Sequence, residues 1–147
     1  MMSTSYPTRR RSLCTVLVVD DHDESRLTER LVLEYYGFVV DEARNGLEAL
    51  AIAQANRPRI VLLDMVLPEI DGRQLARMLR ADPVTRHAAL LAVSAADSPE
   101  ERESAINAGC DAFVSKPVSP MHLVSMIRLY ARRTTPEYPK PADLRFA

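Results

Sequence analysis

The sequence predicts an α/β fold, a doubly wound sheet of five parallel strands with helices on both faces. Two observations support this prediction: short apolar runs recur along the chain, and segments of helical length and period separate them. The runs are Thr15–Asp20, Phe38–Ala43, Ile60–Asp64, Ala89–Ser94 and Ala112–Lys116. Four of them are almost continuously apolar, which is typical of parallel strands covered on both faces. The more mixed second run is expected nearer to an edge.

The segments between the runs carry helix signals. Capping boxes are expected at Asn45 with Glu48 and at Ser98 with Glu101. Further caps are expected at Asp71 and Ser119, and helix ends at Gly37 and Gly109. The apolar faces expected to be buried are Leu27, Leu31, Val32 and Tyr35 in the first helix and Leu47, Leu50 and Ala51 in the second. Strand and helix therefore alternate five times, and right-handed crossovers then place helices on both faces.

Length and composition indicate one globular domain. The chain has 147 residues, of which 47% are apolar and 27% charged. We expect a flexible tail over residues 1–12, a domain over residues 13–133 and a flexible, proline-rich tail over residues 134–147. The net charge of −1 gives no strong field for nucleic acid or an anionic membrane. Cys14 and Cys110 have no metal or redox spacing, which fits a reducing, cytoplasmic compartment.

Polar residues end four of the predicted strands. The first run ends at Asp20, with Asp21 directly after it, and Asp64, Ser94 and Lys116 end the third, fourth and fifth runs. In a parallel sheet these ends meet at one edge, where ligands bind. Any one of them alone is more simply explained by turn or cap chemistry. Together they indicate a site.

The chemistry of this set suits phosphoryl transfer onto a carboxylate. The three aspartates form a hard oxygen site suited to Mg²⁺. Lys116 supplies a point charge and Ser94 a hydroxyl donor for phosphoryl oxygens. Neutralising and positioning the transferring group is the main task of a protein in this reaction.

Four stretches of the chain resemble the receiver domain of bacterial two-component response regulators, in particular its single-domain, chemotaxis-regulator-like members. These stretches are V-L-V-V-D-D, L-L-D-M-V-L-P-E-I-D-G, A-V-S-A and F-V-S-K-P. The resemblance runs from about Leu13 to Arg132. It implies a flavodoxin-like (βα)₅ fold with strand order 2-1-3-4-5. It also implies a signalling domain that assists its own phosphorylation and dephosphorylation rather than an ordinary enzyme.

The resemblance also implies roles for individual residues. Asp64 is the expected phosphoacceptor, and Ser94 and Lys116 are expected to hold the phosphoryl oxygens. The expected Mg²⁺ ligands are Asp20, Asp21, Asp64 and the backbone carbonyl of Val66. Ser94 and Phe113 are the expected switch residues, and Lys116–Pro117 the expected cis peptide. Two departures stand out: Phe113 lacks the hydroxyl of a tyrosine often found there, and Val66 and Ala96 are apolar where some relatives are polar.

The expected partners are a sensor histidine kinase or phosphotransfer protein and a downstream protein that binds the face of the fourth helix, fifth strand and fifth helix. No direct nucleic-acid or membrane partner is expected. A homodimer, a place as a middle carrier in a phosphorelay, and a receiver cut from a longer regulator remain open alternatives. The three histidines, His22, His87 and His122, are expected to be solvated or packed rather than metal ligands.

One alternative comes from another class. Asp21-His22-Asp23-Glu24-Ser25 resembles the D-x-D-x-[ST] motif of haloacid dehalogenase-type phosphatases, which also use a nucleophilic aspartate, a lysine and Mg²⁺. That family needs an acidic motif after the lysine, but the acids after Lys116 are Glu137 and Asp143, both in the expected tail. The alternative also leaves Asp64 unexplained.

Overall fold

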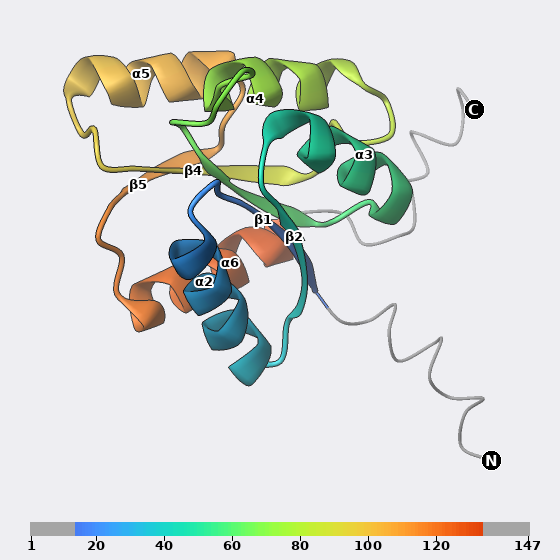
Figure 1. The fold of residues 1–147 in the computed structure, drawn as a ribbon, viewed down its shortest axis with the longest axis vertical. Coiled ribbons are helices and arrows are strands. Elements are labelled where there is room, and N and C mark those ends of the chain that lie inside the picture. The colour runs from blue at the N-terminus through green and yellow to red at the C-terminus, as the bar shows by residue number, and fades with distance from the viewer. Residues whose placement is uncertain (1–13, 134–147) are drawn as a thin grey trace.

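The computed structural model describes residues 14–133, which form one five-stranded parallel sheet. The strand order is β2-β1-β3-β4-β5, so the predicted fold class is confirmed and the mixed second strand lies at an edge (Figure 1). The strands are β1 (Thr15–Val19), β2 (Val39–Ala43), β3 (Ile60–Asp64), β4 (Ala89–Ser94) and β5 (Ala112–Ser115). The tails predicted over residues 1–12 and 134–147 lie outside the described residues, and the domain boundaries stay a prediction.

Helices cover both faces of the sheet. They are α2 (Asp23–Tyr35), α3 (Gly46–Asn56), α4 (Gly72–Ala81), α5 (Pro99–Ala108) and α6 (Pro120–Arg133). Figure 1 shows α2 and α6 on one side and α3, α4 and α5 on the other. Each side has its own apolar core against the sheet. None of the helices in residues 14–133 is long and apolar enough to cross a membrane.

The helix starts use the predicted caps, although the capping boxes differ. The side chains of Asn45 and Ser98 accept the backbone N–H groups of Glu48 and Glu101 as predicted. Neither glutamate returns the bond: Glu48 accepts the N–H of Arg44, and Glu101 binds Arg73. Among the helix starts within residues 14–133, Asp71 with Gln74 makes both bonds of a capping box. The start of α4 is also tied to the loop that leaves β3, because the N–H of Gly72 donates to the carbonyl of Met65 at 3.1 Å.

The predicted buried face of the first helix is wrong. Leu33 is the fully buried residue of α2, and of the predicted face only Val32 is part-buried. The others are exposed: Leu27 at 45%, Leu31 at 52% and Tyr35 at 82%. Leu33 packs into the core, and Arg26 and Arg30 both pair with Glu42 of β2, so the buried side of the helix differs from the predicted one. Regular spacing marks a stripe on a helix but does not say which side faces the core.

The second predicted face is also wrong. The buried residues of α3 are Gly46, Ala49 and Ala53, whereas Leu47 is 59% exposed and Leu50 only packs against the edge of the core. Small residues face the sheet here and allow the helix to lie close to it.

Candidate functional site

Three strands end in the same local turn at one edge of the sheet. In each, the side-chain oxygen of the first polar residue accepts the backbone N–H two residues later. The pairs are Asp20 with His22 (2.9 Å), Asp64 with Val66 (3.0 Å) and Ser94 with Ala96 (3.1 Å). Short polar side chains favour this turn. The turn uses only Oδ1 of each aspartate, and Oδ2 of each remains for other partners.

Lys116, the residue after β5, binds those remaining oxygens. Its Nζ lies 3.2 Å from Oδ2 of Asp64 and 3.6 Å from Oδ2 of Asp20. Its backbone N–H donates to the carbonyl of Ser94 at 2.9 Å, which fixes where the side chain starts. Burial by itself would lower the pKa of Lys116, but Asp64 and Asp20 outweigh it and raise that pKa. The lysine is therefore held as a cation between two carboxylates.

The carboxylates of Asp20 and Asp64 are buried, at 1% and 6% exposure. Burial raises the pKa of Asp64, and the N–H of Val66 and the ammonium of Lys116 only partly oppose it. Asp21 is more open, with 34% of its side chain exposed. Negative charge here is costly, and a bound cation would reduce that cost.

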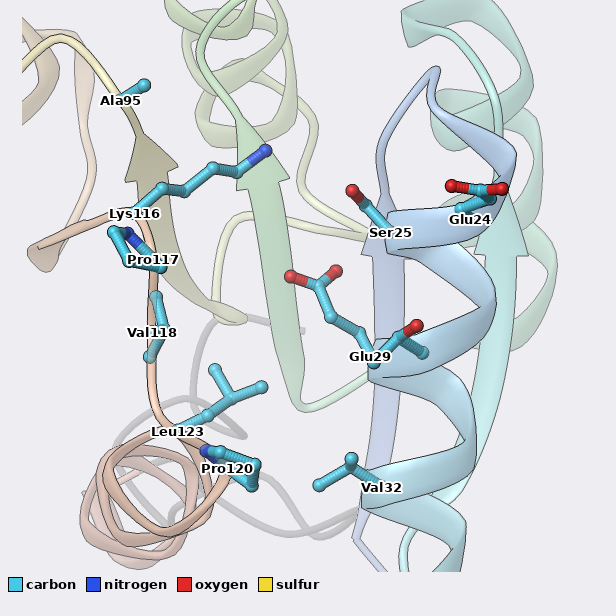
Figure 2. Close-up of a pocket in the computed structure, with 11 residues that line it drawn as sticks. Glu24, Ser25, Glu29, Val32, Ala95, Lys116, Pro117, Val118, Pro120 and Leu123 are labelled. Atoms are coloured by element: carbon cyan, nitrogen blue, oxygen red, sulfur yellow. The ribbon is translucent and has the colours of Figure 1, made fainter.

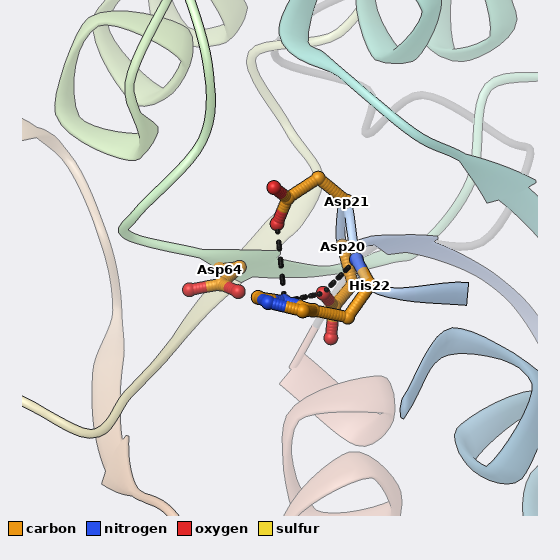
Figure 3. A group of neighbouring side chains, drawn as sticks. All are labelled: Asp20, Asp21, His22 and Asp64. Carbon is orange, nitrogen blue, oxygen red and sulfur yellow. Dashed lines mark hydrogen bonds and ion pairs between the residues drawn. The ribbon is translucent and has the colours of Figure 1, made fainter. Parts of the chain in front are cut away.

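A group that could hold a metal ion consists of Asp20, Asp21, His22 and Asp64, whose ligand atoms lie within 4.8 Å of one another (Figure 3). The three carboxylates offer the oxygen ligands that Mg²⁺ prefers. His22 is solvated, as predicted, with 71% of its side chain exposed, but its Nδ1 also lies 3.4 Å from Asp20 and 3.3 Å from Asp21. Sequence reasoning could have noted that His22 directly follows the two aspartates.

The residues predicted as a switch lie on neighbouring strands. Ser94 is fully buried at the end of β4, one position beyond the register pair Asp64 and Val93. Phe113 of β5 is half-buried at the margin of the core. The guanidinium of Arg102 lies over its ring, 4.9 Å from the ring centre. The Lys116–Pro117 peptide is cis.

Comparison with known proteins agrees with this geometry. Residues 16–128 match the response regulator receiver domain. The chain belongs to this family. As a receiver, the chain is a phospho-accepting signalling module rather than an ordinary enzyme. Membership of the family also implies a histidine kinase as partner. The phosphatase alternative fails because the family match includes Asp64, which that alternative left unexplained.

Several relatives show how far the likeness extends. The polar-differentiation response regulator DivK of Brucella anthropi is 34% identical over 116 residues, which cover 79% of this receiver and 94% of DivK. The response regulator MprA of a Mycobacterium species is 36% identical over 83% of this chain, but the match spans only 52% of MprA. The solved structure of the chemotaxis protein CheY4 of Vibrio cholerae has a TM-score of 0.77 at 26% identity, covering 80% of this chain and 98% of CheY4.

A pocket of about 610 Å³ adjoins the receiver site between α2 and the segment after β5 (Figure 2). Its lower wall is apolar, with Val32, Val118 and Leu123, and Lys116 borders its upper end. Glu29 of α2 is half-buried there and has no ion pair among residues 14–133. Burial, followed by the charge of nearby Asp20, raises the pKa of Glu29 to about 7. Sequence reasoning missed Glu29, because nothing local marks it as facing the sheet.

Proposed function

We propose that Asp64 is the phosphoacceptor of this receiver and that the phosphoryl donor is a phosphohistidine of a sensor kinase or phosphotransfer protein. The observation that supports this most directly is the position of Lys116, whose ammonium lies within 4 Å of both Asp64 and Asp20. A cation beside the buried carboxylate of Asp64 can neutralise the oxygens of a phosphoryl group as that group approaches the carboxylate.

The proposed reaction moves one phosphoryl group. An oxygen of the Asp64 carboxylate attacks phosphorus, the bond from phosphorus to the donor imidazole nitrogen breaks, and the nitrogen keeps the electron pair. Lys116 and the Ser94 hydroxyl would hold phosphoryl oxygens. Asp20, Asp21, Asp64 and the Val66 carbonyl would hold Mg²⁺. When bound, the ion would supply further neutralisation of the phosphoryl charge.

Phosphorylation is proposed to act on a downstream protein through the surface of α5, β5 and α6. The added dianion would draw the Ser94 hydroxyl toward it and open space into which the Phe113 ring can turn. Arg102 lies on that ring and also binds Asp97 and the Ser115 hydroxyl, so movement of Phe113 would disturb the surface of α5. A cytoplasmic location fits the two free thiols, Cys14 and Cys110.

Phosphorylation by acetyl phosphate tests the proposal without a kinase. We expect one phosphoryl group per chain with Mg²⁺, little in excess EDTA, and strongly reduced incorporation in Asp20→Asn and Asp21→Asn. Asp23→Asn is the matched control, because Asp23 is exposed and pairs with Arg26 outside the metal group. Incorporation that is equal with and without Mg²⁺ would contradict the proposed ion, and steady hydrolysis of a small phosphate ester would restore the phosphatase alternative.

A further inference from the structure

A second hollow, of about 480 Å³, lies at the end of the sheet opposite to Asp64. The turn before β4, the C-terminal end of α5, the residues that lead into β5 and the last turns of α6 form its walls. Because the strands are parallel, their N-terminal ends lie here and their C-terminal ends lie at the acidic site. The two sites are thus separated by the length of the sheet.

Arg80 of α4 holds the walls of this hollow in place. Its guanidinium donates to the carbonyls of Gly109 (2.9 Å), Arg86 (2.6 Å) and Ala88 (2.6 Å), and to Oδ2 of Asp111 (2.8 Å). The same carboxylate oxygen also accepts the backbone N–H of Leu90 at 2.8 Å. The hollow is therefore built before any ligand arrives. The charges of Arg80 and Asp111 are already paired with each other.

The remaining charge in the hollow is positive. It comes from Arg86 and Arg133, neither of which has a carboxylate partner within residues 14–133. Among the described residues that line the hollow, Asp111 is the one acid, and it is paired with Arg80. The guanidinium of Arg133 lies over the ring of Tyr130, 5.0 Å from its centre, which limits where the arginine can point. Arg86 and Arg133 are exposed residues, so two guanidinium groups without a carboxylate partner in residues 14–133 border one hollow, in a chain of net charge −1.

We propose that this hollow binds a small anion that carries at least two phosphate groups, such as a diphosphate. A guanidinium group matches phosphate oxygens in geometry as well as in charge, and two such groups suit a diphosphate. The volume lies within the range of roughly 300–1,000 Å³ typical of ligand pockets. Arg133 lies in the last turn of α6, where a positive charge interacts favourably with the helix dipole. Arg86 lies outside any helix, in the loop before β4, so the helix dipole does not explain its position.

The site is independent of Asp64 but touches the surface proposed for the downstream protein. Its walls include the end of α5, the start of β5 and the end of α6. A bound anion would add negative charge to that surface and link the elements that form it. Such a ligand would be a second input to the receiver, separate from phosphorylation.

Binding of ATP and of inorganic pyrophosphate to the full chain, measured by calorimetry in EDTA at low ionic strength, tests the proposal. We expect saturable binding that Arg86→Gln with Arg133→Gln weakens by about tenfold or more. The matched control is Arg77→Gln with Arg132→Gln, which removes the same charge from exposed positions outside the hollow. Tighter binding of ATP than of pyrophosphate would indicate that the ligand is an organic phosphate, and equal binding would indicate an inorganic one. Either result supports binding of a phosphate anion in the hollow.

Three outcomes would overturn the proposal. The first is no saturable binding of either anion, and the second is equal weakening by the control pair. The third is binding that occurs only after Glu137→Gln with Asp143→Asn, which would assign the hollow to carboxylates of the chain's own C-terminal segment. Asp64→Asn should bind both anions as the unaltered chain does, so failure here and failure of the proposed phosphoacceptor are separate results.

Discussion

The ammonium of Lys116 lies 3.2 Å from the carboxylate of Asp64, although Asp64 ends β3 and Lys116 follows β5, and these strands are not neighbours in the sheet. β4 lies between β3 and β5, and its last residue, Ser94, accepts the backbone N–H of Lys116. Lys116 therefore reaches across the end of β4 to the acid on the far side. This contact brings the ends of three strands into one site.

Replacement of Lys116 by Met should slow phosphorylation of Asp64 by acetyl phosphate roughly a hundredfold, the usual effect of losing one preorganised electrostatic contact to the reacting group. Lys116→Arg should recover only part of the rate, because its planar fork does not place charge at the same point. The measurement is the initial rate of phosphate incorporation in saturating Mg²⁺. If the Met variant reacts as fast as the unaltered chain, Lys116 does not hold the phosphoryl group.

Replacement of Glu29 by Gln should stabilise the fold, and more so as the pH rises. The pKa of Glu29 is raised from 4.5 to about 7 in the folded chain. The folded chain therefore binds this proton more tightly than the unfolded chain, and stability falls as pH rises from about 4.5 to about 7. The neutral amide avoids this loss, so the variant should gain about 1–3 kcal/mol at pH 8 relative to pH 5.

Urea unfolding at pH 5 and pH 8, in EDTA, measures this difference. Glu24→Gln is the control, because Glu24 is an exposed residue on the same helix. A stability difference between Glu29→Gln and the unaltered chain that does not change with pH would show that Glu29 titrates as an ordinary surface acid.

Replacement of Gly72 by Ala should destabilise the fold and disturb the loop after β3. A Cβ at Gly72 would lie 2.6 Å from the carbonyl oxygen of Asp64 and 2.6 Å from Cα of Met65, and backbone atoms cannot move aside cheaply. The expected cost is about 1–3 kcal/mol, with slower phosphorylation. Gly46→Ala is the milder control, because its Cβ would meet the side chain of Ile70 at 3.0 Å. Equal melting temperatures for the two variants would contradict this argument.

The phosphorylated receiver should lose its phosphoryl group more slowly than a receiver with polar side chains at positions 66 and 96. The water that hydrolyses an aspartyl phosphate must be positioned in line, and Val66 and Ala96, each two residues beyond a site residue, have side chains that cannot hydrogen-bond. Both are exposed, so polar replacements there can reach solvent. Val66→Asn with Ala96→Glu should speed loss of phosphate about fivefold, the effect of about 1 kcal/mol. The decay is followed in Mg²⁺ without a kinase; equal decay rates would refute the positioning argument.

The parallel sheet and the meeting of the strand ends could be predicted from the residues, whereas the strand order came from the resemblance to receiver domains. Runs such as Ile60–Asp64 are apolar throughout because both faces of the sheet are covered, and that pattern is local. The convergence of Asp20, Asp64 and Lys116 followed from the parallel topology. These features needed no knowledge of individual side-chain contacts.

The rotation of α2 could not be predicted in this way. Leu31 and Tyr35 are apolar and regularly spaced, yet they face solvent, while Glu29 lies inside near the site. The burial of Leu33 in the core and the pairing of Arg26 and Arg30 with Glu42 go with this rotation, and these contacts join residues of different elements. The basic hollow at the opposite end was missed for the same reason. Its arginines come from separate segments that only the tertiary structure brings together.

Intact-mass spectrometry of the unaltered chain and of Asp64→Asn, after incubation with acetyl phosphate and Mg²⁺, shows directly whether Asp64 carries the phosphoryl group. We expect a single added mass of about 80 Da, the mass of one phosphoryl group, on the unaltered chain and none on the variant. Unchanged circular dichroism of the variant would show that its fold survives. The same added mass on Asp64→Asn would contradict the assignment of Asp64 as phosphoacceptor, because the phosphoryl group would then reside on another residue.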